Sequence, residues 1–211
     1  MMLKFRHGLS MAVVALLGAS VLLAQSSRPE DLGAGKLLVV PRDSPDPSFA
    51  ESVVLLVHYD EDGAVGLMIN RRTKLPVSRA LPELKGSSKY SDPVYVGGPV
   101  TIQAVMALLQ SKTEPHPGTH VFGNVYLVST KPDLETAFAA GVGPSELRIY
   151  LGYCGWTRGQ LENEVKRDGW YIFDASAQLV FDSNPSTLWS RMIARTELRI
   201  AQLQGLTHAW F

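Results

Sequence analysis

The polar residues that could support chemistry lie in short, separate stretches of this sequence. His116 and His120 have the i, i+4 spacing of a helical zinc motif, but the proline and glycine between them disfavour the helix that would bring both rings onto one face. Zinc normally has three or four protein ligands, and the acidic run at residues 60–62 lacks the alternating spacing and the distal glutamate of a calcium loop. We therefore expect no metal and no cofactor, and we interpret both stretches as solvated loops.

The common catalytic motifs are absent from the sequence. It contains no Gly-x-Ser-x-Gly elbow, Walker loop or Gly-x-Gly-x-x-Gly fingerprint. The one cysteine, Cys154, follows the apolar run at residues 147–153, which favours a buried thiol over a nucleophile and excludes an internal disulfide. The chain has 20 basic and 20 acidic residues without a block of like charge, so we expect no nucleic-acid partner. These features favour a non-enzymatic role.

A set of turn residues is the remaining candidate for a binding site. Glycine is used where the backbone takes a positive φ or closely approaches another group, and successive amides in such turns can form an anion-binding nest. If the turns meet at one end of a sheet, with Arg71 or Arg72 beside them, they would form a shallow polar site for a small anion. Alternatively, they are tight turns that hold the topology, with Trp156 in the core. The candidate ligand-binding residues are Asn70, Arg71, Gly97, Gly98, Gly152 and Trp156, accompanied by Pro99 and Gly155.

A β-hairpin at residues 52–70 is the element around which the chain is organised. Its two apolar, β-branched runs, residues 53–58 and 65–69, flank the acidic turn, and Gly63 supplies the positive φ that closes the turn. The first run is apolar on both faces. This pattern predicts a central strand that is covered on both sides.

Capping signals and composition predict the other elements. Ser78 is a candidate helix N-cap, Thr157 and Gln160 match a capping box, and Gly205 is expected to end the last helix. Residues 102–110 are ambiguous, because Ala, Met and Leu favour a helix while a short run in a β-rich region favours a strand. The predicted strands are residues 36–40, 94–96, 121–128 with an interruption at Gly123-Asn124, 147–153, and a second hairpin of 170–173 and 178–181; the predicted helices are residues 78–84, 132–140, 158–168 and 186–204.

The first 24 residues differ from the rest of the chain. Lys4 and Arg6 precede an apolar run, and no acidic residue occurs before Glu30. This pattern is typical of a secretory signal peptide; the alternative is an uncleaved membrane anchor, although the run is shorter than the ~20 residues of a spanning helix. We expect an exported, periplasmic or membrane-anchored protein. The predicted divisions are a signal peptide or anchor over residues 1–24, a linker over 25–34, a domain over 35–185 and a helical extension over 186–211.

Five motifs occur in an order that resembles a known family. They begin at Gly35, Phe49, Asp62, Val96 and Gly152. In turn they read Gly-Lys-Leu-Leu-Val-Val-Pro, Phe-Ala-Glu-Ser-Val-Val-Leu-Leu, Asp-Gly-Ala-Val-Gly-Leu-Met-Ile-Asn, Val-Gly-Gly-Pro-Val, and Gly-Tyr-Cys-Gly-Trp continuing through Gln160-Leu-Glu-Asn-Glu164 to Trp170. Together they are similar to the YqgE/AlgH family of small bacterial proteins over residues 33–185.

The resemblance implies a single α+β domain with a mixed, partly barrel-like sheet flanked by helices. It also implies that residues 102–110 form a strand. The family has no established biochemical activity. One of its names reflects a proposed transcriptional-regulatory role, and nothing in this sequence resembles a DNA-reading element. The family pattern is ordinarily cytoplasmic, so the N-terminal segment is a departure from it, as are Arg71 in place of a proline and Cys154 in place of a small residue.

Three functions follow from these observations. We predict a non-enzymatic binding or regulatory protein whose partner is an unknown protein or a small anionic ligand. The first alternative is a small-anion-binding module or enzyme that uses the turn residues. The second alternative is a structural interaction protein that forms a homodimer through its sheet face or its terminal helix. The apolar run at residues 9–24 would tether any of these to a membrane if it is not cleaved.

Overall fold

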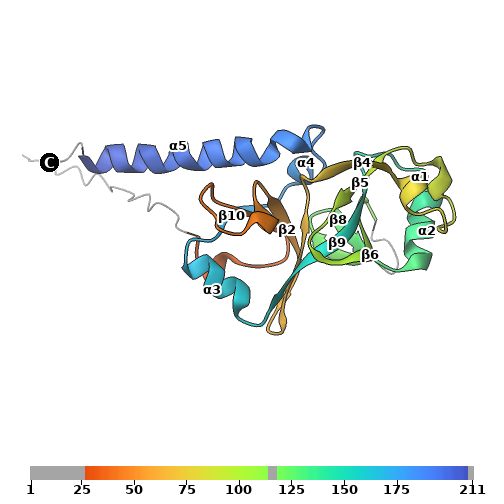
Figure 1. Cartoon of the computed structure of the whole chain (residues 1–211), viewed down its shortest axis with the longest axis horizontal. Coiled ribbons are helices and arrows are strands. Elements are labelled where there is room, and N and C mark those ends of the chain that lie inside the picture. Colours follow the sequence, from red (N-terminus) through yellow and green to blue (C-terminus); the bar gives the residue numbers. More distant parts are fainter. Residues whose placement is uncertain (1–26, 114–117, 209–211) are drawn as a thin grey trace, which may run out of the picture.

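The predicted hairpin forms the middle of the observed sheet (Figure 1). A computed structural model describes residues 27–113 and 118–208, with side-chain surroundings up to residue 198; the predicted signal peptide or anchor at residues 1–24 lies outside these ranges. Strand β2 (Val53–Asp60) pairs antiparallel with β3 (Gly63–Met68) across the acidic turn and with β1 (Lys36–Val39) on its other edge. The first five residues of β2 are buried, which confirms the prediction of a central strand.

Ten strands form one curled, half-barrel-like sheet. Their order is β10-β1-β2-β3-β9-β6-β8-β7, and β4 joins through β5 to β9. All pairings are antiparallel except that of β5 with β9. The predicted α+β class with a mixed, partly barrel-like sheet is therefore confirmed. The remaining strands are β4 (Arg72–Pro76), β5 (Pro93–Val96), β6 (Val100–Gln110), β7 (Thr119–Phe122), β8 (Val125–Val128), β9 (Leu147–Thr157) and β10 (Tyr171–Asp174); β6 confirms the strand predicted at residues 102–110.

Strand β9 connects the two halves of the sheet. Its first part pairs with β6 on one edge and with β5 on the other, and its last part pairs with β3. Its side chains alternate between two cores: Tyr150 and Cys154 pack with β1, β2 and β3, whereas Leu147 and Ile149 pack with α1 (Val77–Ala80) and α2 (Lys131–Ala139). Burial on both faces explains why β9 is an almost continuous apolar run in the sequence.

The helices lie around the sheet (Figure 1). Helices α1 and α2 lie at one end of the molecule, α3 (Gln160–Lys166) lies beside the opposite half of the sheet, and α4 (Ala177–Val180) leads to the long α5 (Leu188–His208). Two contacts attach α5 near β1: the Trp189 indole donates to Val40 O at 2.8 Å, and Arg42 pairs with Glu197 at 2.6 Å. Over the described ranges, no helix is both long and apolar enough to cross a membrane. Short 3-10 turns occur at Pro29–Asp31, Pro47–Phe49, Ser87–Lys89 and Pro185–Thr187.

The predicted capping box at Thr157 is wrong. Thr157 is the last residue of β9 and lies opposite Gly63, and α3 begins at Gln160 with Gly159 as its N-cap. The N–H and the hydroxyl of Thr157 both donate to Gln160 Oε1 at 3.2 Å, so the threonine caps no helix amide. Pairing with β3 keeps Thr157 extended, and Gly159 makes the turn with a left-handed φ of 73°.

Other element predictions are wrong in detail. The second strand of the predicted second hairpin is instead helix α4, because the Ser176 side chain caps the Leu179 N–H and β10 pairs with β1. The N-cap of α1 is Pro76 rather than Ser78, since the helix follows β4 directly. Gly205 lies inside α5 instead of ending it; a glycine costs only about 1 kcal/mol within a helix. Strand β4 was missed because its pairing with β5 is short and irregular.

Candidate functional site

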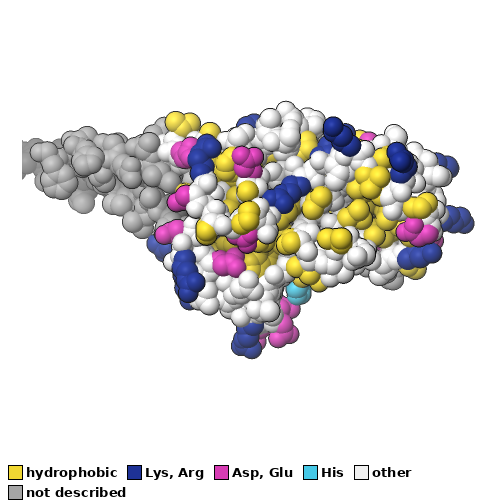
Figure 2. Space-filling model, viewed as in Figure 1, with side chains coloured by type: hydrophobic (Ala, Val, Ile, Leu, Met, Phe, Trp, Pro, Cys, Tyr) yellow, Lys and Arg dark blue, Asp and Glu magenta, His cyan; other side chains and the backbone are white. Residues whose placement is uncertain are grey.

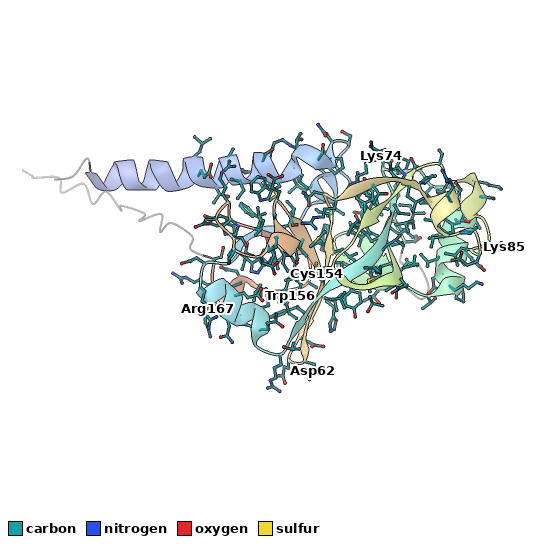
Figure 3. The ribbon with its side chains drawn as sticks, viewed as in Figure 1. Asp62, Lys74, Lys85, Cys154, Trp156 and Arg167 are labelled. Carbon is teal, nitrogen blue, oxygen red and sulfur yellow. The ribbon has the colours of Figure 1, made fainter. Side chains whose placement is uncertain are left out.

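Three of the predicted turn residues, Gly97, Gly98 and Gly152, meet where the chain crosses β9. After β5 on one edge of β9, the chain passes through Gly97, Gly98 and Pro99 and returns as β6 on the other edge. The Gly97 N–H donates to Leu151 O, and Gly97 O accepts from the Met68 N–H, both at 2.8 Å. We call Gly97, Gly98 and Gly152 the crossover. Figure 3 shows Cys154 and Trp156, which follow Gly152 on β9, in the middle of the molecule between its two halves.

Glycine is required at the crossover because two backbones touch there. A Cβ on Gly97 would lie 2.2 Å from Gly152 O, and a Cβ on Gly98 would lie 2.2 Å from Tyr153 C. Gly152 also has a positive φ of 72°, whereas Gly98 does not have a positive φ. Close packing, and at Gly152 also backbone conformation, therefore account for these glycines. Their ligand-binding role remains a prediction.

Asn70 and Arg71 fasten the loop that precedes β2. The side chain of Asn70 is 9% exposed; its Oδ1 accepts from the Val53 N–H at 2.9 Å, and its Nδ2 donates to Glu51 O at 2.8 Å. Arg71 Nη2 donates to Ala50 O at 3.0 Å. Glu51 has a φ of 54°, which a residue other than glycine seldom adopts. Both predicted site residues thus support an unusual backbone turn, and anion binding by them also remains a prediction.

Trp156 lies in an aromatic cluster next to the crossover. Its ring centroid is 6.1 Å from that of Phe49 and 6.1 Å from that of Trp170. The indole N–H groups of Trp156 and Trp170 both donate to Glu164 Oε2, at 2.9 and 2.8 Å. Trp156 is 5% exposed and is a core residue, as the structural alternative predicted. The role of Glu164 was missed, although the final sequence motif contains both tryptophans and this glutamate.

Cys154 is a buried thiol, as the sequence predicted. Its Sγ lies 3.5 Å from Gly97 O, to which the thiol donates. Burial raises the pKa of this thiol to about 12, and the opposing effect of Arg71 is smaller. The thiol is therefore protonated at physiological pH, and a thiol in that state is a poor nucleophile and a poor metal ligand.

The histidine and acidic stretches form no metal site within the described residues. His120 Nε2 lies 3.0 Å from Gly123 O, and His116 lies outside the described residues.

In the acidic turn, Asp60 Oδ1 accepts from the N–H groups of Asp62 and Gly63 at 2.8 and 3.2 Å. The first of these bonds is the main reason that the pKa of Asp60 is lowered. The tip of the hairpin, with Asp62, projects from the molecule (Figure 3), and acidic side chains gather there (Figure 2). This agrees with a solvated turn; across the described part of the chain, no group of three or more suitable ligands is present.

A pocket of about 240 Å³ lies beside β9, on the side of β4 and β5. It is bounded by these strands, by the loop that precedes β9 and by the segment that connects α4 to α5. Its charged lining residues are Arg72, Asp92 and Arg148, and no histidine, lysine or cysteine lines it. We call it the Arg148 pocket. Of the predicted arginines, only Arg72 belongs to this pocket, because Arg71 lies toward the loop before β2.

The register of the sheet brings the pocket residues together. Arg72 lies opposite Tyr95, and Tyr95 lies opposite Tyr150. Arg148 precedes Tyr150 by two positions and therefore projects from the same face of β9. The guanidinium carbon of Arg148 lies 5.0 Å from the centroid of the Tyr95 ring and 5.6 Å from that of Phe181. Aromatic faces thus hold the guanidinium by cation–π contacts.

Arg148 is a buried residue with an exposed fraction of 6%. Its Nη1 donates to Val180 O at 2.8 Å and its Nη2 donates to Asp182 O. Within the described chain, neither its Nε nor the buried Tyr150 hydroxyl forms a hydrogen bond of normal geometry. The two groups are neighbours, because Arg148 opposes the rise in the pKa of Tyr150 that burial causes. The Asp182 carboxylate acts on Arg148 only at longer range and pairs directly with Arg191 at 2.6 Å. Arg148 therefore has carbonyl and aromatic partners, but it forms no ion pair with a described carboxylate.

The tyrosines of the pocket are hydrogen-bond donors at neutral pH. Burial raises the pKa of Tyr95, and Arg148 and Arg72 oppose this shift. Burial also raises the pKa of Tyr90, and the nearby Asp92 carboxylate adds to the shift. Both hydroxyls thus keep their protons. The Tyr90 hydroxyl donates to Phe138 O at 3.2 Å, so the Tyr95 hydroxyl is the tyrosine donor that could bind an anion beside a guanidinium.

Sequence reasoning missed the Arg148 pocket. The available signal was an arginine inside the apolar run at residues 147–153, where a charged side chain needs buried partners. That signal identifies a buried arginine but not its surroundings. Tyr95 and Phe181 come from distant parts of the sequence, so their contact with Arg148 is visible only in the folded chain.

The fold and its two cores define a mixed α+β domain with a curled sheet, and comparison with known proteins identifies the family. The profile of the AlgH-like family matches residues 37–201, and the chain belongs to this family. A UPF0301 protein of Mycobacterium tuberculosis is 34% identical over 175 residues, which cover 81% of this chain and 85% of the relative. A UPF0301 protein of Chlorobaculum tepidum is 32% identical over 165 residues, which cover 78% of this chain and 87% of the relative. The resemblance inferred from the five motifs is confirmed.

Two solved structures resemble the whole domain. The solution structure of the AlgH protein from Pseudomonas aeruginosa superposes with a TM-score of 0.64 at 32% identity, covering 77% of this chain and 87% of that protein. The crystal structure of a Corynebacterium diphtheriae protein superposes with a TM-score of 0.66 at 22% identity, covering 85% of this chain and 94% of that protein, and it supports the fold alone. None of these names states an activity, so a function has to be argued from the pocket.

Proposed function

We propose that this protein is a non-enzymatic ligand-binding domain and that the Arg148 pocket binds a small anion. One observation carries this proposal: Arg148, a buried arginine, lines the pocket without forming an ion pair with a described carboxylate. A buried charge is costly unless a partner of opposite charge or strong hydrogen bonds compensate it. Two carbonyl oxygens already accept from Arg148, and an anion in the pocket would add the opposite charge that these neutral partners do not supply.

Arg148 also has a structural role, which does not account for the pocket as a whole. Its two terminal nitrogens fasten the backbone of Val180 and Asp182. Arg72 lines the same pocket from β4, is exposed and forms no ion pair with any described residue. Two cations in one pocket repel each other, so a purely structural role of Arg148 does not explain Arg72. Paired guanidinium groups are typical of sites that bind carboxylate or phosphate oxygens in a bidentate manner.

The lining residues favour binding over catalysis. The pocket has no histidine, lysine or cysteine, and the pKa values of Tyr90 and Tyr95 are raised away from neutrality. A general base works best when its pKa lies near the operating pH. The serines of the lining, Ser145 and Ser183, have no imidazole beside them in the pocket to activate their hydroxyls.

The proposal is tested by titrating the full chain with inorganic phosphate, sulfate and acetate, using calorimetry and thermal unfolding. An anion present at about 100 times its Kd should stabilise the native state by ~2.7 kcal/mol. Arg72→Gln should weaken binding by roughly tenfold, because it removes one charge-assisted contact. The matched control is Lys74→Gln, which removes an exposed cation of the same strand that does not line the pocket. Equal binding by wild type and Arg72→Gln, or no binding of any of these anions, would overturn the proposal.

We also propose that residues 1–24 direct export or membrane attachment. The support is the basic start at Lys4 and Arg6 followed by the apolar run at residues 9–24. Fractionation of a protein tagged at its C-terminus tests this: the protein should be found in the periplasmic or membrane fraction. Full-length protein in the cytosolic fraction would contradict export and would agree with the usual location of the family.

A further inference from the structure

We infer that the ligand of the Arg148 pocket is a small amphoteric molecule of the amino-acid type, with a carboxylate and an ammonium group on a short apolar body. This inference rests on the proposed binding function and adds the class of ligand. It comes from the presence of Asp92 in the same lining as the two arginines. The three charged groups give the pocket a positive and a negative side.

The charges of the lining do not neutralise one another. In the described structure, Asp92 forms no ion pair with Arg72 or Arg148, although all three line one pocket. These three charges act on the hydroxyl of Tyr95 together with Asp182, whose carboxylate pairs with Arg191 at 2.6 Å. Two cations and a carboxylate that line one pocket without pairing leave one position for a negative ligand group and another for a positive one.

The register of β4 and β5 explains how the charges are held. Arg72 lies opposite Tyr95 in this pair of strands, and Asp92 immediately precedes β5. The backbone of Asp92 is fixed, because its carbonyl accepts from the Val77 N–H at 2.8 Å. Asp92 is half-buried and lines the pocket.

The size and the lining of the pocket favour a small ligand. The pocket volume of about 240 Å³ is below the range of roughly 300–1,000 Å³ that is usual for drug-sized ligands. Apart from its charged residues, serines and tyrosines, the lining is apolar, with Val77, Pro93, Leu147 and Phe181 among its members. These dimensions suit a single amino acid with an aliphatic side chain better than a nucleotide.

Charge balance distinguishes an amino acid from a simple acid. A carboxylate alone would pair with the arginines but would also face Asp92, and like charges at short range oppose binding. An ammonium group on the same ligand would instead pair with Asp92. The guanidinium groups and the protonated Tyr95 hydroxyl would bind the carboxylate, and the ligand would leave the charge of the pocket unchanged.

Three probes of equal carbon skeleton test this inference by calorimetry with the full chain. L-leucine has both charged groups, 4-methylpentanoate lacks the ammonium group, and L-leucinamide lacks the carboxylate. We expect L-leucine to bind at least roughly tenfold more tightly than either of the others, since each of them loses one charge-assisted contact. Thermal unfolding of every variant without a probe verifies that it is folded.

Two variants test which pocket residue binds each charged group of the ligand. Asp92→Asn should abolish the preference for L-leucine over 4-methylpentanoate, and Arg72→Gln should weaken both of these probes while preserving the preference. If wild type binds 4-methylpentanoate as tightly as L-leucine, or binds inorganic anions but none of the three probes, the amphoteric inference is wrong and the anion-binding proposal stands. If neither the three probes nor the inorganic anions bind, both are wrong.

Discussion

At the crossover, the backbones of β3, β5 and β9 hydrogen-bond to one another, and the adjoining side chains of Asn70 and Cys154 also bond to backbone groups. Only four residues before Gly152 on the same strand, Arg148 has a buried nitrogen without a described partner, in a pocket that also contains Arg72. The first region has the glycine-rich motifs of the family, and the second has no motif. The glycine turns thus hold strands together, whereas the arginines of the pocket have no ion-pair partner among the described residues, and this difference is the reason that we propose ligand binding at the pocket.

The largest effect is expected from Gly98→Ala at the crossover. The added Cβ would lie 2.2 Å from Tyr153 C, and neither backbone can move without breaking the pairing of β9. Overpacking of this kind costs about 3 kcal/mol or more. Chemical denaturation measures the loss, and Gly143→Ala is the control, because a Cβ at Gly143 meets nothing within 4 Å. If both variants unfold at the same midpoint, close packing at the crossover is not the reason for Gly98.

A smaller loss is expected from Asn70→Ala. The substitution leaves the Val53 N–H and Glu51 O without the partners that Asn70 provides. An unsatisfied buried group costs roughly 1–3 kcal/mol, so the free energy of unfolding should fall by about 2 kcal/mol. Asn163→Ala on the exposed face of α3 is the control and should change little. A loss confined to ligand binding, with stability unchanged, would instead support Asn70 as a site residue.

The unfolding free energy measured above pH 9 tests the burial of the Cys154 thiol. Its pKa rises from the usual 9.0 to about 12 on folding, so the protonated thiol stabilises the native state fully below pH 9. This contribution is lost as the pH rises from 9 toward 12, at roughly 1.4 kcal/mol per pH unit. Unfolding free energies of wild type and Cys154→Ala should therefore converge over this range. If the two unfolding free energies keep a constant difference from pH 9 to 12, the pKa of the thiol is not raised by folding.

The smallest effect on stability is expected at the pocket, from Arg72→Gln. Arg72 is exposed and forms no ion pair with a described residue, and surface charges of this kind change stability by less than about 1 kcal/mol. The unfolding midpoint should stay close to that of wild type, while anion binding weakens. A large loss of stability without any change in binding would place Arg72 with the structural residues and remove the contrast between the two regions.

Local sequence patterns correctly predicted the elements that depend on residues adjacent in the sequence. The β2–β3 hairpin follows from two apolar runs around Gly63, and α2 follows from Pro132 and the acidic residues at its start. The same reasoning failed at Thr157, where a capping signal lies within a strand. Pairing of β9 with β3 extends through Thr157 and outweighs a cap that is worth only about 1 kcal/mol. It also failed at α4, where β10 found its partner in β1 rather than in the residues that follow it.

The sequence by itself determined the family, the central hairpin, the burial of Cys154 and the set of turn residues, because each depends on neighbouring residues or on motifs in order. The tertiary structure alone decided how those turns pack. Gly98 needs its missing Cβ because Tyr153, 55 positions later, passes against it. Likewise, Arg72, Asp92, Arg148 and Phe181 line one pocket only because β4, β5, β9 and the segment after α4 meet in space. Long-range pairing of strands sets both arrangements, and no local pattern encodes such pairing.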